Sequence, residues 1–496
     1  MVAGSAAMGV TVILLLTMRY GVGVTPDSVQ YIAAARSLAS GDGFVGYDGR
    51  EITSWPPIYS TLLALAQIGV NSDLLQLARF INALLFGLII LLSIIFTTSM
   101  LPTDGKSIIL AALLVLLAPP LQQVSATAWS EPLFIALVLV FLFNLQSFLK
   151  NGAATRFSNM VIIAAVTPLV RYIGASLIIT GVISIFLMPQ RIWVNRWKSA
   201  IPFGLLASLP LLAWMARNFS LSDTLMGHRS SATVSLAQIV NQTAGLLFVW
   251  LLPWILVLAI LLVLARYSNV GRRGYFERFE RSRHQLVPLI VFTVVYISML
   301  LYSESATELN EVDNRYVSPV FVPLILLALF LVSVTLEQLR GRLASRNYNL
   351  LVFSSSVFLI SYSLVITGLV DISFLRFGVG GFGTKLWHDS ELVQYIRSNP
   401  DIQQHSIYTN GPDVTYLLFD LETEPVPVRS RGESPDGEDL LSSMRRAWPP
   451  NDGYLIWYDN IEREYLFTVE DLRQISTIEP VASLSDGSVF RVYAVD

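Results

Sequence analysis

The chain contains many apolar blocks of about twenty residues, such as Leu74–Met100 and residues 246–265. Blocks of that length match the ~30 Å hydrocarbon core of a lipid bilayer. Charged residues make up 14% of the 496-residue chain, whereas a soluble domain carries roughly 25%. The sequence therefore predicts an α-helical polytopic membrane protein. It excludes a soluble enzyme, a nucleic-acid binder and a disordered protein.

Hydropathy predicts about eleven transmembrane helices within residues 1–370. The fifth and sixth are short and close together, so we expect a bent hairpin there. The predicted helices centre near Val12, Ala83, Leu113, Leu139, Ala164, Ile179, Leu206, Ile255, Val295, Ile325 and Val357.

The apolar blocks stop after Val370, and the polar tail is long enough for a small domain. Its periodicity predicts helices at 389–398, 412–419 and 469–475 and strands at 406–409 and 453–458, with an edge strand at 488–495. Residues 425–450 are rich in Pro, Ser, Gly and charge and are expected to form a mobile loop. These patterns predict a small α/β domain over residues 386–496.

Most Lys and Arg residues of the short loops fall on one side of the predicted spans. By the positive-inside rule, the N-terminus is then cytoplasmic and the C-terminal domain extracytoplasmic, in the cell (plasma or inner) membrane. The basic run 266–283 is expected to contact anionic membrane lipids rather than nucleic acid. Cysteine is absent and the four histidines show no ligand spacing, so no metal site is predicted from the residues.

The first outer loop, residues 24–73, is much longer than an ordinary connection. Thr25, Pro26 and Asp27 predict a helix start, and Gly41 and Gly43 predict its end. A second amphipathic helix is expected after the Trp-Pro-Pro sequence at 55–57. We expect both helices to lie in the membrane interface.

Asp27 follows the end of the first span, and two interpretations of it stay open. As a residue of the first helical turn it favours the positive end of the helix dipole. As a carboxylate at the bilayer surface it is a candidate general base that takes a proton from an acceptor hydroxyl.

Five stretches together resemble the GT-C superfamily of lipid-phosphosugar glycosyltransferases, in particular the bacterial protein O-mannosyltransferase and aminoarabinose transferase-like branch. The likeness covers most of residues 1–336. Many relatives have two adjacent acidic residues in the first loop, whereas Ser28 follows Asp27 here. The stretches are Asp27 with Tyr31 and Ala35-Arg36, Pro56-Pro57-Ile58-Tyr59, Ser130-Glu131-Pro132, Arg171-Tyr172, and Arg315-Tyr316 with Pro319.

The resemblance implies transfer of a sugar from a polyprenyl-phosphate donor to an acceptor protein, lipid or glycan outside the cytoplasm. Such a reaction needs a base for the acceptor proton and fixed cations for the leaving phosphate. Arginine suits the phosphate because its planar fork binds oxygens bidentately. The candidate phosphate-binding residues are Arg171, Arg217, Arg229 and Arg315.

Two of these arginines, Arg171 and Arg229, also have an ordinary explanation. Arg171 lies in an apolar stretch, where it either faces protein, water or a bound anion, or extends to the interface. Arg229 is equally compatible with surface charge, whereas Arg217 and Arg315 adjoin span ends, where a lipid head group would lie.

Glu131 opens the fourth predicted span. It is either a helix-start residue or a second acid that faces Asp27 and orients the acceptor or holds a divalent cation. No cofactor is required by the sequence, although a divalent cation is compatible with it. Further candidates for the sugar or lipid site are Tyr31, Trp55, Tyr59, His228 and Tyr316.

Two rival functions stay open. A transporter or lipid flippase also has many spans and buried arginines, but it is expected to show internally repeated spans, which this sequence lacks. A non-catalytic receptor would use its C-terminal domain to bind a partner. In that case deletion of residues 389–496 would abolish activity in cells, whereas Asp27→Asn would not.

Overall fold

The computed structural model describes residues 2–101, 105–187, 193–227, 234–268, 270–307, 312–428 and 448–494. Its contacts divide the chain into two compact units. The helical unit comprises Met1–Val22 and Ile52–Val379, and the α/β unit comprises Gly23–Glu51 and Gly380–Asp496. The predicted first outer loop, residues 24–73, is therefore divided between the two units, whereas the sequence analysis assigned all of it to the membrane domain.

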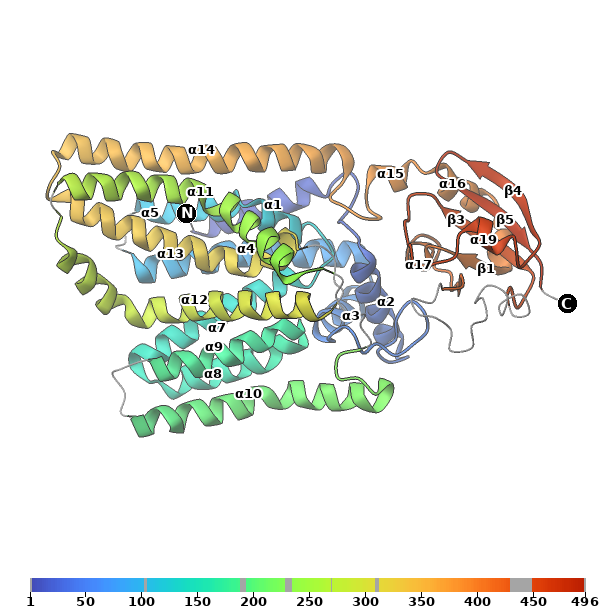
Figure 1. Cartoon of the computed structure of the whole chain (residues 1–496), viewed down its shortest axis with the longest axis horizontal. Helices are drawn as coiled ribbons and strands as arrows, with labels where there is room; N and C mark the ends of the chain where they lie inside the picture. The colour runs from blue at the N-terminus through green and yellow to red at the C-terminus, as the bar shows by residue number, and fades with distance from the viewer. Residues whose placement is uncertain are drawn as a thin grey trace. The chain divides into compact units, whose positions relative to one another are not determined.

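The helical unit is a bundle of α-helices (Figure 1), with two short 3₁₀ turns between α8 and α9. All eleven predicted span centres fall inside helices of this unit. Its elements are α1 (Val2–Leu16), α3 (Ile58–Val70), α4 (Leu74–Met100), α5 (Gly105–Leu116), α6 (Pro119–Ser125), α7 (Glu131–Asn151), α8 (Ala154–Val166), η1 (Thr167–Leu169), η2 (Tyr172–Gly174), α9 (Ala175–Leu187), α10 (Trp193–Ser222), α11 (Leu236–Tyr267), α12 (Arg272–Ala306), α13 (Asn314–Arg340) and α14 (Ser345–Phe377).

Within the described residues, seven helices are long and apolar enough to cross a membrane, or eight if the bent pair α5–α6 forms one span. Helices α1, α8 and α9 are apolar but shorter than 18 residues. The expected class, a helical multi-pass membrane protein with a small C-terminal α/β part, is confirmed. The number eleven stays a prediction.

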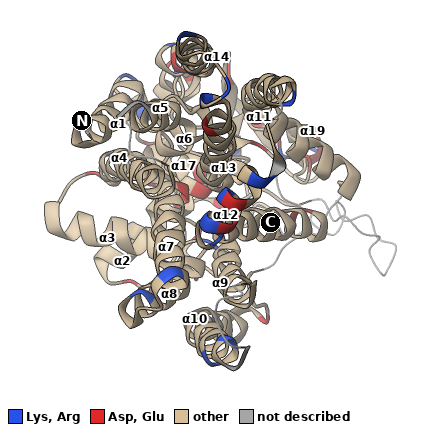
Figure 2. Cartoon of the chain, turned by 90° about the vertical axis from the view of Figure 1, so that its left-hand side faces the viewer, with Lys and Arg blue, Asp and Glu red and all other residues tan. Residues whose placement is uncertain are grey.

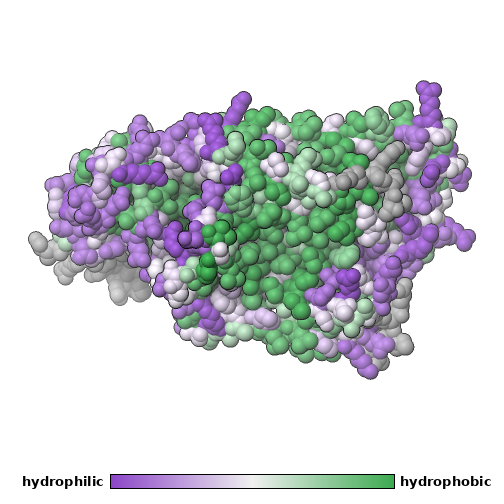
Figure 3. All heavy atoms as spheres, turned by 180° about the vertical axis from the view of Figure 1, so that it is seen from behind, coloured by the Kyte–Doolittle hydropathy of each residue, from purple (hydrophilic) through white to green (hydrophobic). Residues whose placement is uncertain are grey.

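The surface of the bundle is apolar where a soluble protein would be polar. Figure 3 shows a broad hydrophobic area over the helical unit, and most of the ribbon in the end-on view of Figure 2 is neither acidic nor basic. Leu209 on α10, Ile260 on α11 and Leu364 on α14 are each more than half exposed. Exposed aliphatic side chains on long helices are typical of a lipid-facing surface.

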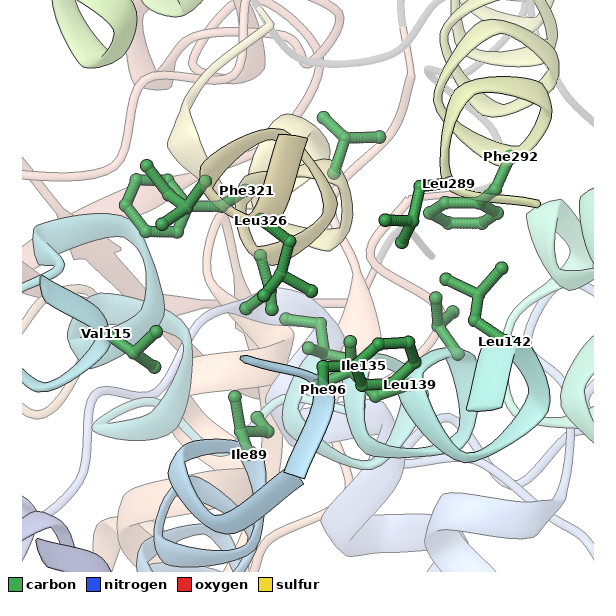
Figure 4. Packing of buried hydrophobic residues seen from close by; sticks show 14 of the residues in the cluster. Ile89, Phe96, Val115, Ile135, Leu139, Leu142, Leu289, Phe292, Phe321 and Leu326 are labelled. Carbon is green, nitrogen blue, oxygen red and sulfur yellow. The ribbon is translucent and has the colours of Figure 1, made fainter. Parts of the chain in front are cut away.

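Helices α7 and α13 lie in the interior of the bundle. In each of them, 72% of an 18-residue apolar stretch is buried. Figure 4 shows Ile135 and Leu139 of α7 near Phe96 of α4, and Leu326 of α13 in the same cluster. Close packing of this kind holds each helix in a defined rotation about its axis. Residues at the ends of α7 and α13 are thereby fixed in position.

The α/β unit contains a five-stranded sheet with the order β2-β1-β3-β5-β4. Strand β1 is parallel to β2 and β3, whereas β5 is antiparallel to β3 and β4. Its elements are α2 (Pro26–Ser40), α15 (Lys385–His388), α16 (Glu391–Ser398), η3 (Ile402–Gln404), β1 (Ser406–Thr409), α17 (Pro412–Phe419), β2 (Glu424–Pro425), β3 (Gly453–Tyr458), α19 (Val469–Leu472), β4 (Ile478–Leu484) and β5 (Gly487–Val492).

The sequence placed β1, α17 and β3 at their observed bounds, but it was wrong about the edge of the sheet. The last strand, β5, lies between β3 and β4. Strand β4 has mostly partly or fully exposed residues and therefore lacks the apolar alternation by which a strand is recognised. Most of the predicted loop 425–450 lies outside the described residues.

Candidate active site

Glu131 joins two arginines in the interior of the helical unit. It is the first residue of α7, and its side chain is fully buried. One carboxylate oxygen, Oε1, accepts hydrogen bonds from Nη1 of Arg171 and from Nε of Arg315. The side chains of Arg171 and Arg315 are 15% and 8% exposed. Three of the residues predicted from the sequence thus form one buried ionic cluster.

Arg171 reaches this cluster because the helix is interrupted at that point. Its backbone is extended, with φ −150° and ψ 133°, between η1 and η2. Gly174 lies so close to the preceding turn that an added Cβ would be 2.6 Å from the carbonyl carbon and oxygen of Thr167. This interruption separates α8 from α9, the two short apolar blocks of the sequence.

Arg315 is held at the start of α13. The carboxylate of Asp313 accepts the backbone N–H of Arg315 at 2.8 Å and so caps the helix. The guanidinium carbon of Arg315 lies 4.3 Å from the ring centroid of Trp129, a cation–π geometry. The neighbouring Tyr316 is partly buried, and its carbonyl accepts the hydroxyl of Tyr296 at 2.8 Å.

A second polar cluster surrounds Tyr172, the residue after Arg171. Its hydroxyl donates to the carbonyl of Thr53 at 2.8 Å and accepts from Nε1 of Trp214 at 3.1 Å. Nδ2 of the buried Asn218 lies 3.0 Å from the same hydroxyl. The cluster therefore joins the η2 turn, the start of segment 52–57 and helix α10. The sequence analysis missed Trp214 and Asn218 as members of the site, although both adjoin Arg217 within three residues.

Arg217 belongs to this second cluster. Its Nη1 donates to the carbonyl of Ile52 at 2.8 Å and to Oδ1 of Asn218 at 3.2 Å. The guanidinium carbon lies 4.6 Å from the Trp214 ring centroid. Asn218 contacts both Arg217 and Tyr172. Because Tyr172 directly follows Arg171 in the chain, these contacts connect Arg217 to the Glu131 cluster.

We expect Tyr172→Phe to lower the free energy of unfolding by about 1–3 kcal/mol, because the carbonyl of Thr53 and two donors lose their common partner. Thermal unfolding in detergent measures this change. Tyr302→Phe is the matched control, since Tyr302 is 74% exposed on α12. Equal melting temperatures for the two variants would show that this hydroxyl has no structural role.

Tyr59 is fully buried on α3 and is connected to the first cluster through Asn82. Its hydroxyl donates to Oδ1 of Asn82, and Nδ2 of Asn82 donates to the carbonyls of Thr127 and Trp129 at 2.7 and 3.1 Å. Trp129 is the residue whose ring contacts the guanidinium group of Arg315. Asn82 was overlooked in the sequence, where a lone polar residue within an apolar span is the available signal.

Asp27 and Tyr31 lie on α2, in the α/β unit. Thr25 is the N-cap of this helix, as predicted, and its N–H donates to the hydroxyl of Ser28 at 3.1 Å. Asp27 occupies the first turn and is partly buried, while Tyr31 is 3% exposed. Trp55, in the helical unit, is partly buried just before α3.

Two predicted residues, His228 and Arg229, lie outside the described part of the chain. Among the residues that are described, no group of three or more histidine and carboxylate side chains gathers as metal ligands would. The divalent cation considered from the sequence therefore stays untested.

No family model and no curated protein matches the chain by sequence. Solved structures do match it. The crystal structure of ArnT from Cupriavidus metallidurans in the apo state aligns with 98% of this chain and 97% of its own, at 14% identity and a TM-score of 0.60. The same protein bound to undecaprenyl phosphate aligns over the same shares at 15% identity and a TM-score of 0.59.

The chain has the GT-C fold. Arabinofuranosyltransferase AftD from Mycobacteria shares it over 99% of this chain and 40% of the AftD chain, at 14% identity and a TM-score of 0.53. The resemblance stated from the sequence motifs is thus confirmed at the level of the GT-C fold. In this chain, α7 begins at Glu131 and α13 carries Arg315 in its first turn.

Proposed function

We propose that this protein is an integral membrane glycosyltransferase that uses a polyprenyl-phosphate sugar as donor. The acceptor is a hydroxyl group on a protein, lipid or glycan on the extracytoplasmic side of the cell membrane. In this proposal the N-terminus is cytoplasmic and the α/β unit extracytoplasmic, as the distribution of Lys and Arg indicates.

The reaction is a displacement at the anomeric carbon. The carboxylate of Asp27 takes the proton of the acceptor hydroxyl while the oxygen of that hydroxyl forms a bond to the anomeric carbon. The bond from that carbon to the phosphate oxygen breaks, and the lipid phosphate leaves with the electron pair. The negative charge that develops on the phosphate is stabilised by guanidinium groups.

The observation that carries the proposal is the convergence of Arg171 and Arg315 on Glu131 in a GT-C fold. A guanidinium has five N–H donors in a planar fork, so each arginine can hold the carboxylate and a phosphate oxygen together. ArnT, which shares the fold at a TM-score of 0.59, has been solved with bound undecaprenyl phosphate. A buried, two-arginine cluster is suited to the same class of ligand.

In this proposal Glu131 is the counter-ion that orients the two arginines, rather than the second acid considered from the sequence. Its Oε1 accepts hydrogen bonds from both guanidinium groups, and a single oxygen shared by two arginines fits the role of a counter-ion. Arg217 binds phosphate from the edge of the site. The aromatic rings of Tyr31, Trp55, Tyr59 and Tyr316 are proposed to shape the sugar and lipid site, with His228 and Arg229 as further contributors.

The proposal is tested with purified protein in detergent and undecaprenyl phosphate that carries a radiolabelled pentose or hexose. With a membrane extract as acceptor, we expect free undecaprenyl phosphate to appear as the label moves to the acceptor. Boiled protein is the control. If the donor instead stays intact while it crosses the bilayer of proteoliposomes, the protein is a transporter or flippase. Intact donor on one side of the bilayer would support the receptor interpretation and overturn the proposal.

A further inference from the structure

Helix α2, which carries Asp27, is held at its start by the segment that opens the second half of the α/β unit. Val24 comes just before the N-cap, and its N–H donates to the carbonyl of Gly380 at 3.2 Å. The carbonyl of Val24 accepts the N–H of Phe382 at 2.7 Å. These two bonds form a parallel bridge between Val24 and Gly381. The backbone is thus fixed three residues before Asp27.

Gly381 makes this bridge possible. Its φ is +59°, and a Cβ added there would lie 1.9 Å from the carbonyl oxygen of Val24. Any other residue would both strain the backbone and push the two segments apart. The position of the α2 N-terminus therefore depends on a glycine more than 350 residues later in the chain.

The last part of α2 is held by α17. Nη1 of Arg36 donates to the hydroxyl of Tyr416 at 3.0 Å and forms an ion pair with Asp420. The guanidinium carbon also lies 5.1 Å from the Tyr416 ring centroid. An exposed ion pair alone is worth little, but here it is joined to a hydrogen bond and a ring contact on the same side chain.

The loop after α2 makes a third contact with α17. The rings of Tyr47 and Tyr416 lie 6.2 Å apart. Burial, together with the charge of Asp413, raises the pKa of Tyr47 to about 12. The neutral phenol therefore persists across the physiological range, so this contact does not titrate there.

We propose that the α/β unit positions the catalytic base, with Gly381 and Arg36 as the positioning residues. The inference rests on the proposed function, in which Asp27 takes the acceptor proton. Helix α2 is fixed at both ends by one unit, so the direction of its first turn is set by the bridge at Val24 and by the Arg36 contact. Displacement of a reacting group by about 1 Å can cost 10²-fold in rate.

The test compares Gly381→Ala with Gly49→Ala in the full chain. Gly49 also has a positive φ, +70°, but nothing lies within 4 Å of an added Cβ. We expect Gly381→Ala to lower kcat about 100-fold while KM for the lipid-linked sugar and the melting temperature of the helical unit stay unchanged. Gly49→Ala should keep wild-type kcat. An unchanged kcat in Gly381→Ala, or an equal loss in both variants, overturns the inference.

A charge exchange keeps the inference testable if Gly381→Ala fails to fold. Arg36→Asp and Asp420→Arg should each lower kcat, and the double variant should restore part of it, because the ion pair reforms in reverse. A double variant no better than the single variants contradicts the positioning role. The outcomes separate the two proposals: full activity in Asp27→Asn rejects the proposed function, whereas an inactive Asp27→Asn with an active Gly381→Ala rejects the positioning role alone.

Discussion

Asp27→Asn is expected to abolish sugar transfer while donor binding persists. An amide has nearly the shape of the carboxylate but takes no proton, and loss of a general base costs about 10²–10⁴-fold in rate. Release of undecaprenyl phosphate from the labelled donor measures turnover, and retention of the labelled donor on immobilised protein measures binding. Asp27 lies in the first turn of α2, where its negative charge interacts favourably with the positive end of the helix dipole. Because this interaction is weak, we expect its loss in Asp27→Asn to lower the stability only slightly.

Asp42→Asn is the matched control for this prediction. Asp42 is an exposed carboxylate that follows α2 in the same segment, so its substitution changes the net charge equally and should leave turnover unchanged. Turnover by Asp27→Asn within a few per cent of wild type would show that another group, or none, removes the acceptor proton.

Arg315→Ala is expected to weaken binding of undecaprenyl phosphate about 10- to 100-fold. A hydrogen bond to a charged group contributes roughly 1.5–3 kcal/mol, and each 1.4 kcal/mol corresponds to a factor of ten in affinity. Arg315→Lys should lose much of the same affinity, because an ammonium group keeps the charge but not the planar fork. Titration calorimetry with undecaprenyl phosphate in detergent measures both variants.

A control variant and a stability measurement accompany this second prediction. Arg340→Ala removes an exposed arginine from the opposite end of the same helix, α13, and should bind the lipid as wild type does. Because Glu131 stays buried in Arg315→Ala, a lower melting temperature is also expected, and Arg315→Lys then reports affinity in a folded protein. Wild-type affinity in Arg315→Lys would mean that the fork of Arg315 does not hold the phosphate.

The helices could be predicted because apolar block length is a local property. Every predicted span centre lies in a helix, and the N-cap at Thr25 and the end of α2 at Gly41 were predicted from residue type alone. The number of spans is harder, since α1, α8 and α9 are only 13 to 15 residues long. Such helices lie near the lower limit of what hydropathy can distinguish from buried segments.

The partners of the site residues could not be predicted from the sequence. The sequence singled out Glu131, Arg171 and Arg315, but it did not pair Glu131 with either arginine, and it left open whether Glu131 only starts a helix or faces Asp27. The observed partners of Glu131 lie 40 and 184 residues away, and their meeting depends on the packing of α7 and α13 and on the extended backbone at Arg171. Periodicity likewise indicated an amphipathic α2, which we expected to lie in the membrane interface, but it gave no means of identifying α17 as its neighbour.

The division of residues 23–51 from the rest of the first loop has a practical consequence for protein production. A truncated fragment that begins at residue 380 contains the whole sheet but lacks α2, so the face of α17 that contacts Arg36 is left bare. A soluble version of this part would need residues 23–51 fused ahead of 380–496 through a short artificial linker. Likewise, a chain cut at residue 389 lacks both the sheet and α17, which contacts α2. Loss of activity in cells that express it is therefore expected for a receptor and for an enzyme alike.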